Sequence, residues 1–480
     1  MGRVSGVVDG VVNGVRHDLN VINAAVGRLS EVTTTIAGSP QTLAGAVTWR
    51  ADGRLTGRSF GNGLRETRTY DTRGQLRTQQ LGTEVTTYAY DPAGNLLSRS
   101  WPGADHAWDY DALDRVTGDR LDARARSYAY DANHNRRDAL IEGLPEAYGY
   151  APASNRLTAL ATPATSQVLT QDAAGNLTDD GAGQTYAYNQ AGRLASAETA
   201  AGITGYRYSA LGLRTHKAGA TTTVFHHDAA GRLLAETTAD GTPIRSYVWF
   251  GDEPLAQLDG PLGSETPTYL HTDHLATPRL GTDPAGIPVW RWESPAFGDA
   301  PPSLQLRTVN LRFPGQYYDA ETGLHQNWHR DYDPRIGRYV QSDPVGLAGG
   351  SNSYGYVQQN PNRHTDPTGQ LIPAVAAGVA GACARNPACV RAVAATAQAA
   401  VDAVAVGVVM FNDDGSDSTD LPDNDDTVPE QCSDDDEDDN CEALYQSTLR
   451  TCASLTGRKR FACFEAARIN REQCYQERGK

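Results

Sequence analysis

The sequence predicts a mostly β protein made of repeated β-hairpins, and three observations support this fold class. The 480 residues include 48 Gly and 22 Tyr but only 8 Phe and 2 Met, which favours turns and strands over helices. A unit that joins an aromatic residue to Asp recurs about every twenty residues between Tyr70 and His227. Each unit also fits a strand, a turn and a second strand. A helical bundle is therefore excluded for most of the chain.

Nine such units follow one another. They read TYDTRGQL, AYDPAGNL, DYDALDRV, AYDANHNR, GYAPASNR, TQDAAGNL, AYNQAGRL, RYSALGLR and HHDAAGRL. In the second unit, the alternating run 86–90 fits a strand, and Asp91-Pro92-Ala93-Gly94 fits a turn. One hairpin is not stable alone, but hairpins that pair edge to edge give a continuous sheet. We interpret the repeated Tyr and Asp as scaffold, because a catalytic residue is not normally repeated nine times.

Longer motifs follow the repeats. YLHTDHLATPR occupies residues 269–279, GQYYDAETGL residues 315–324 and YDPRIGRYVQSDPVGL residues 332–347. Together with the nine units, these motifs resemble the YD-repeat, or Rhs-repeat, superfamily, which includes bacterial Rhs proteins, the C subunits of insecticidal toxin complexes and teneurins. The resemblance covers roughly residues 45–370. It implies a β-shell, open or closed, that winds around the polypeptide following it.

The resemblance and the changes in composition divide the chain into six segments. They are an N-terminal amphipathic helix region (1–40), the YD/Rhs repeats (45–260), the Rhs-associated core (261–370), Ala/Gly/Val-rich apolar helices (371–411), an acidic disordered linker (412–440) and a Cys-rich helical hairpin (441–480). The N-terminal helix is predicted because Val8, Val15, Ile22 and Leu29 fall at heptad spacing. The expected fold is thus a β-shell with a small α-helical C-terminal extension.

The resemblance also implies one reaction, which is self-cleavage at the end of the core. The family segment PxxxxDPxGL corresponds here to Pro361, Asp366, Pro367, Gly369, Gln370 and Leu371, with Gln370 in the place of the family's Leu. The scissile bond would then be Gln370–Leu371. No other catalytic signature is found in the sequence.

By the same resemblance, Arg330, Asp331 and Asp343 are the expected catalytic residues, because they match an Arg-Asp pair with a second Asp twelve positions on. Amide hydrolysis by aspartates needs two carboxylates close enough to share a proton, one as base toward water and one as acid. The alternative is that Asp343-Pro344, like Asp333-Pro334, only forms a turn.

The segment after the core leaves two interpretations open. Ala392–Phe411 is long enough to span a bilayer, but Asp402 near its middle would cost ~2.5–3.5 kcal/mol on insertion scales. The segment is thus either membrane-inserting or a helical hairpin packed inside a shell or against itself. Cys383 and Cys389 flank a turn between two apolar runs and are candidates for a small disulfide loop.

The net charge of −16 is concentrated in one place. Residues 413–439 hold fourteen Asp or Glu and no Lys or Arg, which predicts a disordered linker. Its carboxylates lack the spacing and the turn-forming Gly of a calcium loop. The rest of the chain is nearly balanced, so no nucleic-acid partner is expected. No metal or other cofactor is predicted.

Four cysteines in the last segment are evenly spaced. Cys441, Cys452, Cys463 and Cys474 are eleven residues apart, about three helical turns, which places them on one face of each helix of a hairpin. The nested disulfides would be Cys441–Cys474 and Cys452–Cys463. A zinc site is the competing interpretation, although zinc motifs use close pairs, and free thiols are the third.

These features predict a toxin-type delivery protein that encloses or displays its own C-terminal extension as cargo. The expected partners are that cargo, a secretion system or immunity protein, and a membrane if residues 371–411 insert. No N-terminal signal peptide is visible, so we expect a secreted or cell-surface protein that uses another route, or a cytoplasmic one until delivery. The alternatives are a non-catalytic surface, adhesion or structural repeat protein, and a degenerate fragment of a longer Rhs protein.

Overall fold

The computed structural model describes residues 5–12, 15–23, 28–36 and 39–370. All of them belong to the first of two compact units of the chain, Met1–Val409, while the second, Met410–Lys480, lies outside the described residues. The described part consists of strands with two short 3-10 helices, which confirms a mostly β fold. The predicted helical extension, acidic linker and all seven cysteines also lie outside the described residues.

The first sheet contains sixteen strands in sequence order, each antiparallel to the next. They are β1 (Ser5–Val12), β2 (Val15–Asn23), β3 (Leu29–Ile36), β4 (Ser39–Trp49), β5 (Leu55–Phe60), β6 (Arg65–Tyr70), β7 (Leu76–Leu81), β8 (Glu84–Tyr90), β9 (Leu96–Trp101), β10 (Ala104–Tyr110), β11 (Val116–Leu121), β12 (Arg124–Tyr130), β13 (Arg136–Ile141), β14 (Leu144–Tyr150), β15 (Leu157–Ala161) and β16 (Ser166–Val168). Neighbours in this order are neighbours in sequence, as stacked hairpins require.

The second sheet contains fourteen strands, again in sequence order. They are β17 (Thr170–Gln171), β18 (Leu177–Asp179), β19 (Thr185–Tyr188), β20 (Leu194–Thr199), β21 (Gly202–Tyr208), β22 (Arg214–Ala218), β23 (Thr222–His227), β24 (Leu233–Thr238), β25 (Pro243–Phe250), β26 (Glu253–Asp259), β27 (Thr266–Thr272), β28 (Pro278–Thr282), β29 (Pro288–Arg291) and β30 (Leu304–Gln305). Within the described ranges, both long sheets are open, because their first and last strands are not hydrogen-bonded to each other.

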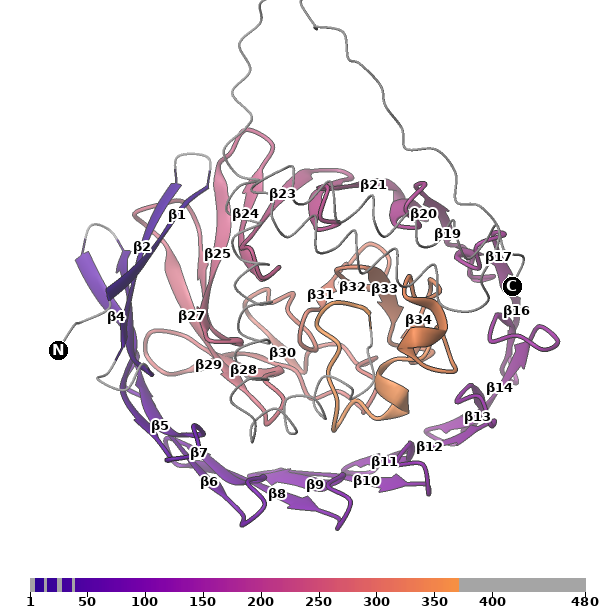
Figure 1. Cartoon of the computed structure of the whole chain (residues 1–480), viewed down its shortest axis with the longest axis horizontal. Coiled ribbons are helices and arrows are strands. Elements are labelled where there is room, and N and C mark those ends of the chain that lie inside the picture. Colours follow the sequence, from indigo (N-terminus) through magenta and orange to yellow (C-terminus); the bar gives the residue numbers. More distant parts are fainter. Residues whose placement is uncertain (1–4, 13–14, 24–27, 37–38, 371–480) are drawn as a thin grey trace, which may run out of the picture. The chain divides into compact units, whose positions relative to one another are not determined.

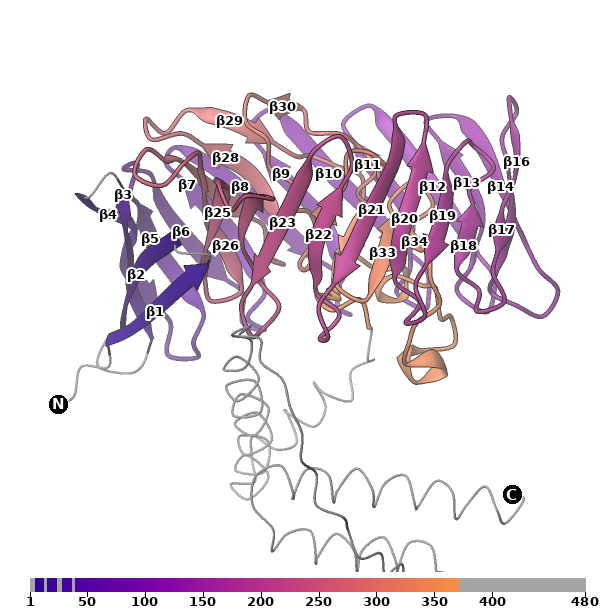
Figure 2. The same ribbon diagram turned by 90° about the horizontal axis from the view of Figure 1, so that it is seen from above.

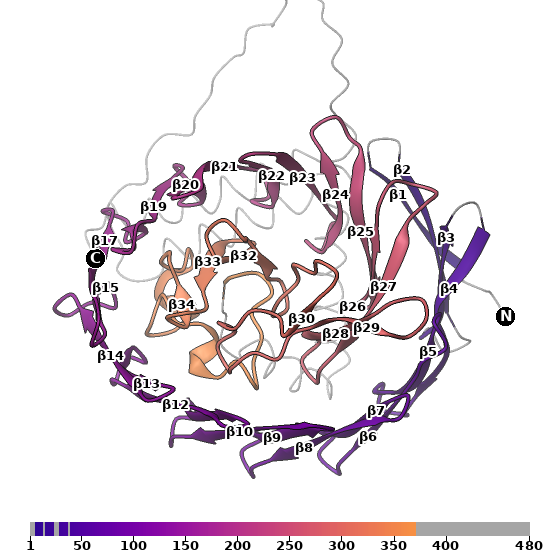
Figure 3. The ribbon, with the colours of Figure 1, turned by 180° about the vertical axis from the view of Figure 1, so that it is seen from behind.

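A small third sheet follows, and it carries the residues of the predicted site. It consists of β31 (Tyr317–Tyr318), β32 (His325–Asn327), β33 (Arg330–Asp333) and β34 (Arg338–Tyr339). The 3-10 helices η1 (Gly346–Gly349) and η2 (Val357–Gln359) come after it. Figures 1 and 3 show the two long sheets following a curved wall, with the end of the second sheet (β28–β30) and β31–β34 on its inner side. From above, the strands of the wall stand side by side, with their turns along two rims (Figure 2).

Eight of the nine repeat units share one turn structure, and the unit at Tyr150 has a turn that is one residue longer. In the second unit, Asp91 Oδ1 accepts hydrogen bonds from the backbone N–H groups of Gly94 and Asn95, at 2.7 and 2.8 Å. Gly94 has a φ of +96°, which only glycine adopts readily. A β-bulge shifts the pairing register just before Tyr90. The predicted turn at Asp91–Gly94 is therefore confirmed, and so is the prediction that the Asp serves the turn.

The repeated tyrosines connect successive units. The hydroxyl groups of Tyr110, Tyr130, Tyr150 and Tyr208 donate hydrogen bonds to the carbonyls of Leu96, Val116, Arg136 and Leu194, respectively, at 2.7 to 2.8 Å. Each acceptor lies near the start of the return strand of the preceding hairpin. The tyrosines therefore serve the scaffold, as the repeat predicted.

The predicted N-terminal helix at residues 1–40 is wrong. The described residues form β1 to β4 instead, and β1 pairs with β2 so that Val12 lies opposite Val15. The heptad spacing of apolar residues suggested a helix, but valine favours strands and the recurring glycines weaken a helix. In the sequence, Asn13-Gly14 separates the two strands, and Asn-Gly is a strong hairpin signal.

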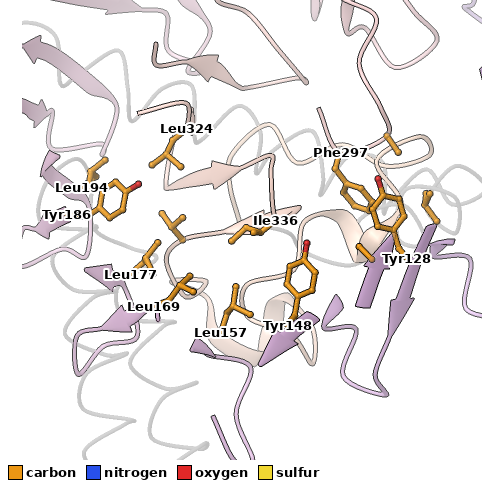
Figure 4. Packing of buried hydrophobic residues seen from close by; sticks show 14 of the residues in the cluster. Tyr128, Tyr148, Leu157, Leu169, Leu177, Tyr186, Leu194, Phe297, Leu324 and Ile336 are labelled. Carbon is orange, nitrogen blue, oxygen red and sulfur yellow. The ribbon is translucent and has the colours of Figure 1, made fainter. Parts of the chain in front are cut away.

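Buried side chains join the wall to the inner segments, by which we mean the chain from Phe297 to the end of the core. Phe297, Leu324 and Ile336 from the inner segments pack against Tyr128, Tyr148, Leu157, Leu169, Leu177, Tyr186 and Leu194 from the wall (Figure 4). One cluster thus takes residues from all three sheets or their connections, and burial of these apolar side chains is the main stabilising contribution. The inner segments are consequently held in a fixed position against the wall.

An ion-pair cluster joins the beginning of the wall to β26. We call it the seam, and it consists of Arg58, Glu66, Arg68 and Glu253. Arg58 donates to Glu66 at 2.7 Å and to Glu253 at 2.8 Å, and Arg68 donates to the same two carboxylates at 2.8 and 2.7 Å. Side chains from β5, β6 and the first residue of β26 therefore connect the two long sheets, which no strand pairing joins among the described strands.

Candidate functional site

The predicted site is gathered around one buried guanidinium. Arg330 is the first residue of β33, and its side chain is 1% exposed. Its Nη2 atom lies 2.8 Å from Asp343 Oδ2 and 3.3 Å from Asp366 Oδ2. Its Nε donates to the backbone carbonyl of Gly369 at 2.5 Å. One side chain therefore contacts two carboxylates and the last carbonyl before Gln370.

The position of Arg330 is fixed on two more sides. Nη1 donates to the carbonyl of Ser353 at 3.0 Å. The guanidinium carbon lies 3.7 Å from the centre of the Tyr339 ring, within the range of a cation–π contact. The planar fork of arginine makes these simultaneous contacts possible, whereas a lysine ammonium has neither the fork nor the flat face.

Asp366 connects the end of the core to the third sheet. Its Oδ2 accepts a hydrogen bond from the Tyr339 hydroxyl at 2.8 Å, and its Oδ1 accepts one from the backbone N–H of Gln370 at 3.0 Å. Its backbone carbonyl accepts from the side-chain amide of Asn327 at 2.8 Å. The predicted motif residue Asp366 thus closes a turn over residues 366–370 and holds that turn against β32 and β34.

Gly369 is required by the close approach of two backbones. Its φ is +66°, and a Cβ atom at this position would lie 2.3 Å from the carbonyl oxygen of Asn327. On the neighbouring residue, the Thr368 carbonyl accepts hydrogen bonds from the backbone N–H of His329 at 3.1 Å and contacts its ring Nδ1 at 3.0 Å. The Gly of the cleavage motif therefore has a structural reason, since any side chain there would push the turn away from Arg330.

The remaining residues of the cleavage motif occupy different surroundings. Pro361 is buried, whereas Pro367 is exposed. Gly315 approaches Pro367 so closely that a Cβ at position 315 would lie 2.1 Å from the Pro367 carbonyl oxygen. Gln370 is the last described residue, and Leu371 lies outside the described residues together with the rest of the C-terminal extension.

Asp343 is buried beside a like charge. Burial raises the pKa of its carboxyl above the ordinary value, Arg330 and the backbone N–H of Val345 act against this, and Asp366 raises it further. Asp343 Oδ1 also accepts the Val345 N–H at 3.0 Å, which is a turn of the kind expected for Asp-Pro. The residue therefore combines the turn role with a carboxyl that faces Arg330.

Asp331 contacts a different set of groups from Arg330. Successive residues of a strand point to opposite faces, and the contacts agree with this rule. Asp331 Oδ2 accepts from the side-chain amide of Gln341 at 2.5 Å, while its buried Oδ1 has no hydrogen-bond partner. Burial raises the pKa of Asp331 to about 6. Among the described residues, no hydrogen bond or ion pair joins Asp331 with Asp343.

Arg330, Asp343 and Asp366, which were expected from the sequence, lie together, whereas Asn327, His329 and Tyr339 were not expected at this site. The position of Tyr339 could have been predicted, because the turn sequence Asp333-Pro-Arg-Ile-Gly337 indicates a hairpin. That hairpin pairs Tyr332 with Tyr339, which places Tyr339 on the face of β33 that Arg330 also occupies. Asn327 and His329 have no comparable signal, because their contacts depend on the return of the chain at residue 366.

Comparison of the chain with known proteins gives related sequences. No family model matches. The chain is 31% identical over 355 residues to toxin protein Tse5 of Pseudomonas aeruginosa, covering 64% of this chain and 25% of that protein. It is 32% identical over 330 residues to double-stranded DNA deaminase toxin A of Burkholderia cenocepacia, covering 62% and 22%. The chain therefore spans about a quarter of the length of these curated relatives.

Solved structures show the same fold. A crystal structure of TcdB2-TccC3-TEV superposes with a TM-score of 0.61 at 19% identity, covering 74% of this chain and 20% of that chain. The Photorhabdus luminescens Tc holotoxin pore superposes with a TM-score of 0.58 at 19% identity, covering 75% and 20%. At this identity the likeness concerns the fold alone.

Proposed function

Because the chain belongs to the Rhs/YD-repeat family, we propose that its described part is the β-shell and core of a toxin-delivery protein that cuts itself after Gln370. The released cargo would be the extension from Leu371 onward. Delivery out of the producing cell, and the secretion or immunity partners that it requires, belong to this proposal. It is supported by relatives that are toxins and by the arrangement at the end of the core.

One observation carries the cleavage proposal. Arg330 holds the Gly369 carbonyl through Nε while Nη2 contacts Asp343 and Asp366. Immediately afterwards, the Gln370 N–H is fixed by Asp366. The peptide segment that leads into the Gln370–Leu371 bond is therefore bound at two consecutive backbone groups, one acceptor and one donor. Such fixed positioning of a reacting segment is a large part of rate enhancement.

In the proposed reaction, water adds to the carbonyl carbon of Gln370 and the bond to the Leu371 nitrogen breaks. Gln370 becomes a carboxylate and the Leu371 nitrogen leaves as an amine after gaining a proton. Asp343 is the carboxyl that we propose for moving this proton, since its pKa is raised by burial. Arg330 positions the segment. Asp331 enters the proposal through the family resemblance, as the second carboxyl of the pair.

The experiment is the intact mass of the purified full chain and of Asp343→Asn, after a fixed incubation at neutral pH. We expect two species from the parent, one beginning at Leu371, and one unbroken 51.5 kDa chain from the variant. Asp333→Asn is the matched control, because Asp333 also precedes a proline and is buried but contacts Arg335 rather than Arg330.

The results separate the proposal from its alternatives. Cleavage in the parent and in Asp333→Asn, with none in Asp343→Asn, supports it. An unbroken parent contradicts it and favours a structural or adhesion protein in which Arg330 only anchors the end of the core. Cleavage in all three chains contradicts the role of Asp343. The same comparison with Asp331→Asn tests whether that residue takes part.

A further inference from the structure

A two-residue loop joins β32 to β33, and its first residue has a backbone conformation that is unusual for its type. Asn327 pairs with Arg330, so Trp328 and His329 form the loop of this hairpin. Trp328 has a φ of +46°, in the left-handed region that Gly, Asn or Asp usually occupies in such loops. A bulky residue in this region is strained and persists only where its surroundings fix it. The contacts of Trp328 show which surroundings these are.

Trp328 is attached to the wall at three successive repeat turns. The first turn supplies Arg193, whose Nη1 donates to the Trp328 carbonyl at 3.0 Å. The second turn supplies the carbonyl of Leu211, which accepts from the indole Nε1 at 3.1 Å. The third turn supplies Gly231, and the indole lies so close to it that a Cβ at position 231 would be 2.3 Å from the ring atom Cζ3. These turns belong to the last three of the nine repeat units.

The residues on either side of Trp328 hold the turn that Asp366 closes at the end of the core. The backbone N–H of His329 donates to the Thr368 carbonyl at 3.1 Å, and the ring Nδ1 of His329 contacts the same oxygen at 3.0 Å. The side-chain amide of Asn327 donates to the Asp366 carbonyl at 2.8 Å. Among the described residues, no hydrogen bond joins Trp328 itself to this turn. The link from the wall to the turn therefore runs through the two neighbours of Trp328.

We propose that Trp328 is a positioning residue for cleavage after Gln370, because it fixes the site against the wall. The loop between β32 and β33 cannot shift without breaking the contacts of Trp328 with the repeat turns. The same loop sets where Asn327, His329 and Arg330 meet the chain ahead of the scissile bond. A displacement of about 1 Å in a reacting segment can slow a reaction about 100-fold. This inference rests on the proposed function, since it concerns the same cleavage.

The test displaces Trp328 from the side of the wall. Gly231→Ala places a Cβ against the indole ring at a position far from the scissile bond in the sequence. Gly241→Ala is the matched control, since Gly241 has a φ of +87° against +83° at Gly231 but nothing within 4 Å of its Cβ position. Cleavage of each full chain is followed with time during cell-free translation. We expect Gly231→Ala to be cut at least about tenfold more slowly than Gly241→Ala.

A second variant shows whether the effect passes through the indole. Trp328→Gly removes the ring but suits the φ of +46°, so it relieves the strain of the loop. We expect it to be cut at least about tenfold more slowly than the parent, and Gly231→Ala to cause no further loss in the same chain. Cleavage of Trp328→Gly at the parent rate would overturn the proposal, since the residue would then serve the loop alone. An equal effect of Gly231→Ala with and without the indole would also overturn it.

Hydrogen exchange separates this inference from the proposed function. Mass spectrometry measures exchange in the peptides that contain His329 and Gln370, whose backbone N–H groups both donate within the last turn of the core. All chains also carry Asp343→Asn, so that they are compared uncut. We expect faster exchange at both positions in Gly231→Ala and no change in its control. This result with an uncut parent would contradict the proposed function and keep the positioning role, whereas unchanged exchange would contradict the positioning role whether or not the parent is cut.

Discussion

The Nη2 atom of Arg330 lies 2.8 Å from Oδ2 of Asp343, and neither side chain is more than 3% exposed. The pair connects β33 to the loop that precedes η1. The same guanidinium also contacts Asp366 and the Gly369 carbonyl, so one residue makes three of the contacts that hold the last turn of the core, alongside those of Asn327 and Tyr339 with Asp366. A buried charge network of this kind loses much of its stability when one member is removed.

Replacing Arg330 by lysine keeps the charge and removes the fork. We expect Arg330→Lys to lose cleavage at Gln370–Leu371 and to lower the free energy of unfolding by about 1–3 kcal/mol, because one ammonium cannot serve two carboxylates and a carbonyl. Gel analysis and urea unfolding measure the two effects. Arg338→Lys is the control on the adjacent strand, where the arginine lies over Tyr150 and Tyr354 outside this network. Cleavage in Arg330→Lys at the parent rate would refute the role of the fork.

The close approach at Gly369 gives a second prediction. Gly369→Ala should slow cleavage and destabilise the core, because the Cβ would lie 2.3 Å from the Asn327 carbonyl oxygen. Gly323→Ala is the matched control, since Gly323 has a similar φ of +75° but nothing within 4 Å of its Cβ position. Both variants carry the left-handed penalty of about 1–2 kcal/mol, and only the first carries the clash. Equal melting temperatures and equal cleavage would show that the backbone contact is unimportant.

The hairpin repeat was predictable because its signals are local. A turn such as Asp91–Gly94 needs only an Asp that accepts two nearby N–H groups and a Gly with positive φ, so four residues specify it. The strands of the N-terminal region were not predictable in this way, because apolar residues at heptad spacing fit a helix while the β-branched side chains and glycines fit strands. Periodicity alone gave the wrong element at β1 and β2.

The site was predictable only in part, for a different reason. The family motif contains Arg330, Asp343 and Asp366, but which carboxylates meet depends on where β33 begins. With Arg330 as its first residue, the strand directs Asp331 to the opposite face. The contacts of Asn327 and Tyr339 with the chain at Asp366 span 39 and 27 residues, and no short-range pattern encodes them.

The tyrosine links between repeats give a third prediction. Tyr130→Phe removes a 2.7 Å hydrogen bond to the Val116 carbonyl and should lower the free energy of unfolding by about 1 kcal/mol. Tyr128→Phe, two residues earlier in the same strand, is the control, because no described hydrogen bond involves the Tyr128 hydroxyl. Urea unfolding of both variants checks this. A loss that is the same in both would mean that the link between repeats contributes nothing.

The buried Asp331 predicts a pH dependence. Its pKa is raised from 3.8 to about 6 by burial, so the native state binds more protons than the unfolded state between these values. The group therefore stabilises below pH 4, and this contribution is lost as the pH rises through 6. Over this range the parent should lose about 3 kcal/mol that Asp331→Asn does not lose. Urea unfolding at pH 4 and pH 7.5 measures the difference.

A control of opposite sign is available at Asp71. Its pKa is lowered, chiefly by the hydrogen bond from the Gln75 backbone, so its contribution is present above pH 4 and disappears at lower pH. Asp71→Asn should therefore lose stability relative to the parent at pH 7.5, whereas Asp331→Asn gains. If the difference between Asp331→Asn and the parent is the same at both pH values, Asp331 does not titrate as the structure implies.

The seam predicts where the shell is most sensitive to the loss of one charge. Burial alone would raise the pKa of Glu253, but Arg68 and Arg58 hold it below its usual value. Its contribution is therefore present above the unfolded pKa of 4.5 and is lost as the pH falls through the lower folded value. Glu253→Gln leaves the two arginines partly unpaired and should cost about 3–5 kcal/mol at pH 7.

Asp109→Asn is the control, because its pair with Arg120 is half exposed and contributes at most about 1 kcal/mol. Urea unfolding at pH 7 and pH 3 should show a smaller difference between Glu253→Gln and the parent at the lower pH. A cost at pH 7 no larger than that of Asp109→Asn would mean that apolar packing, and not the seam, joins the two long sheets.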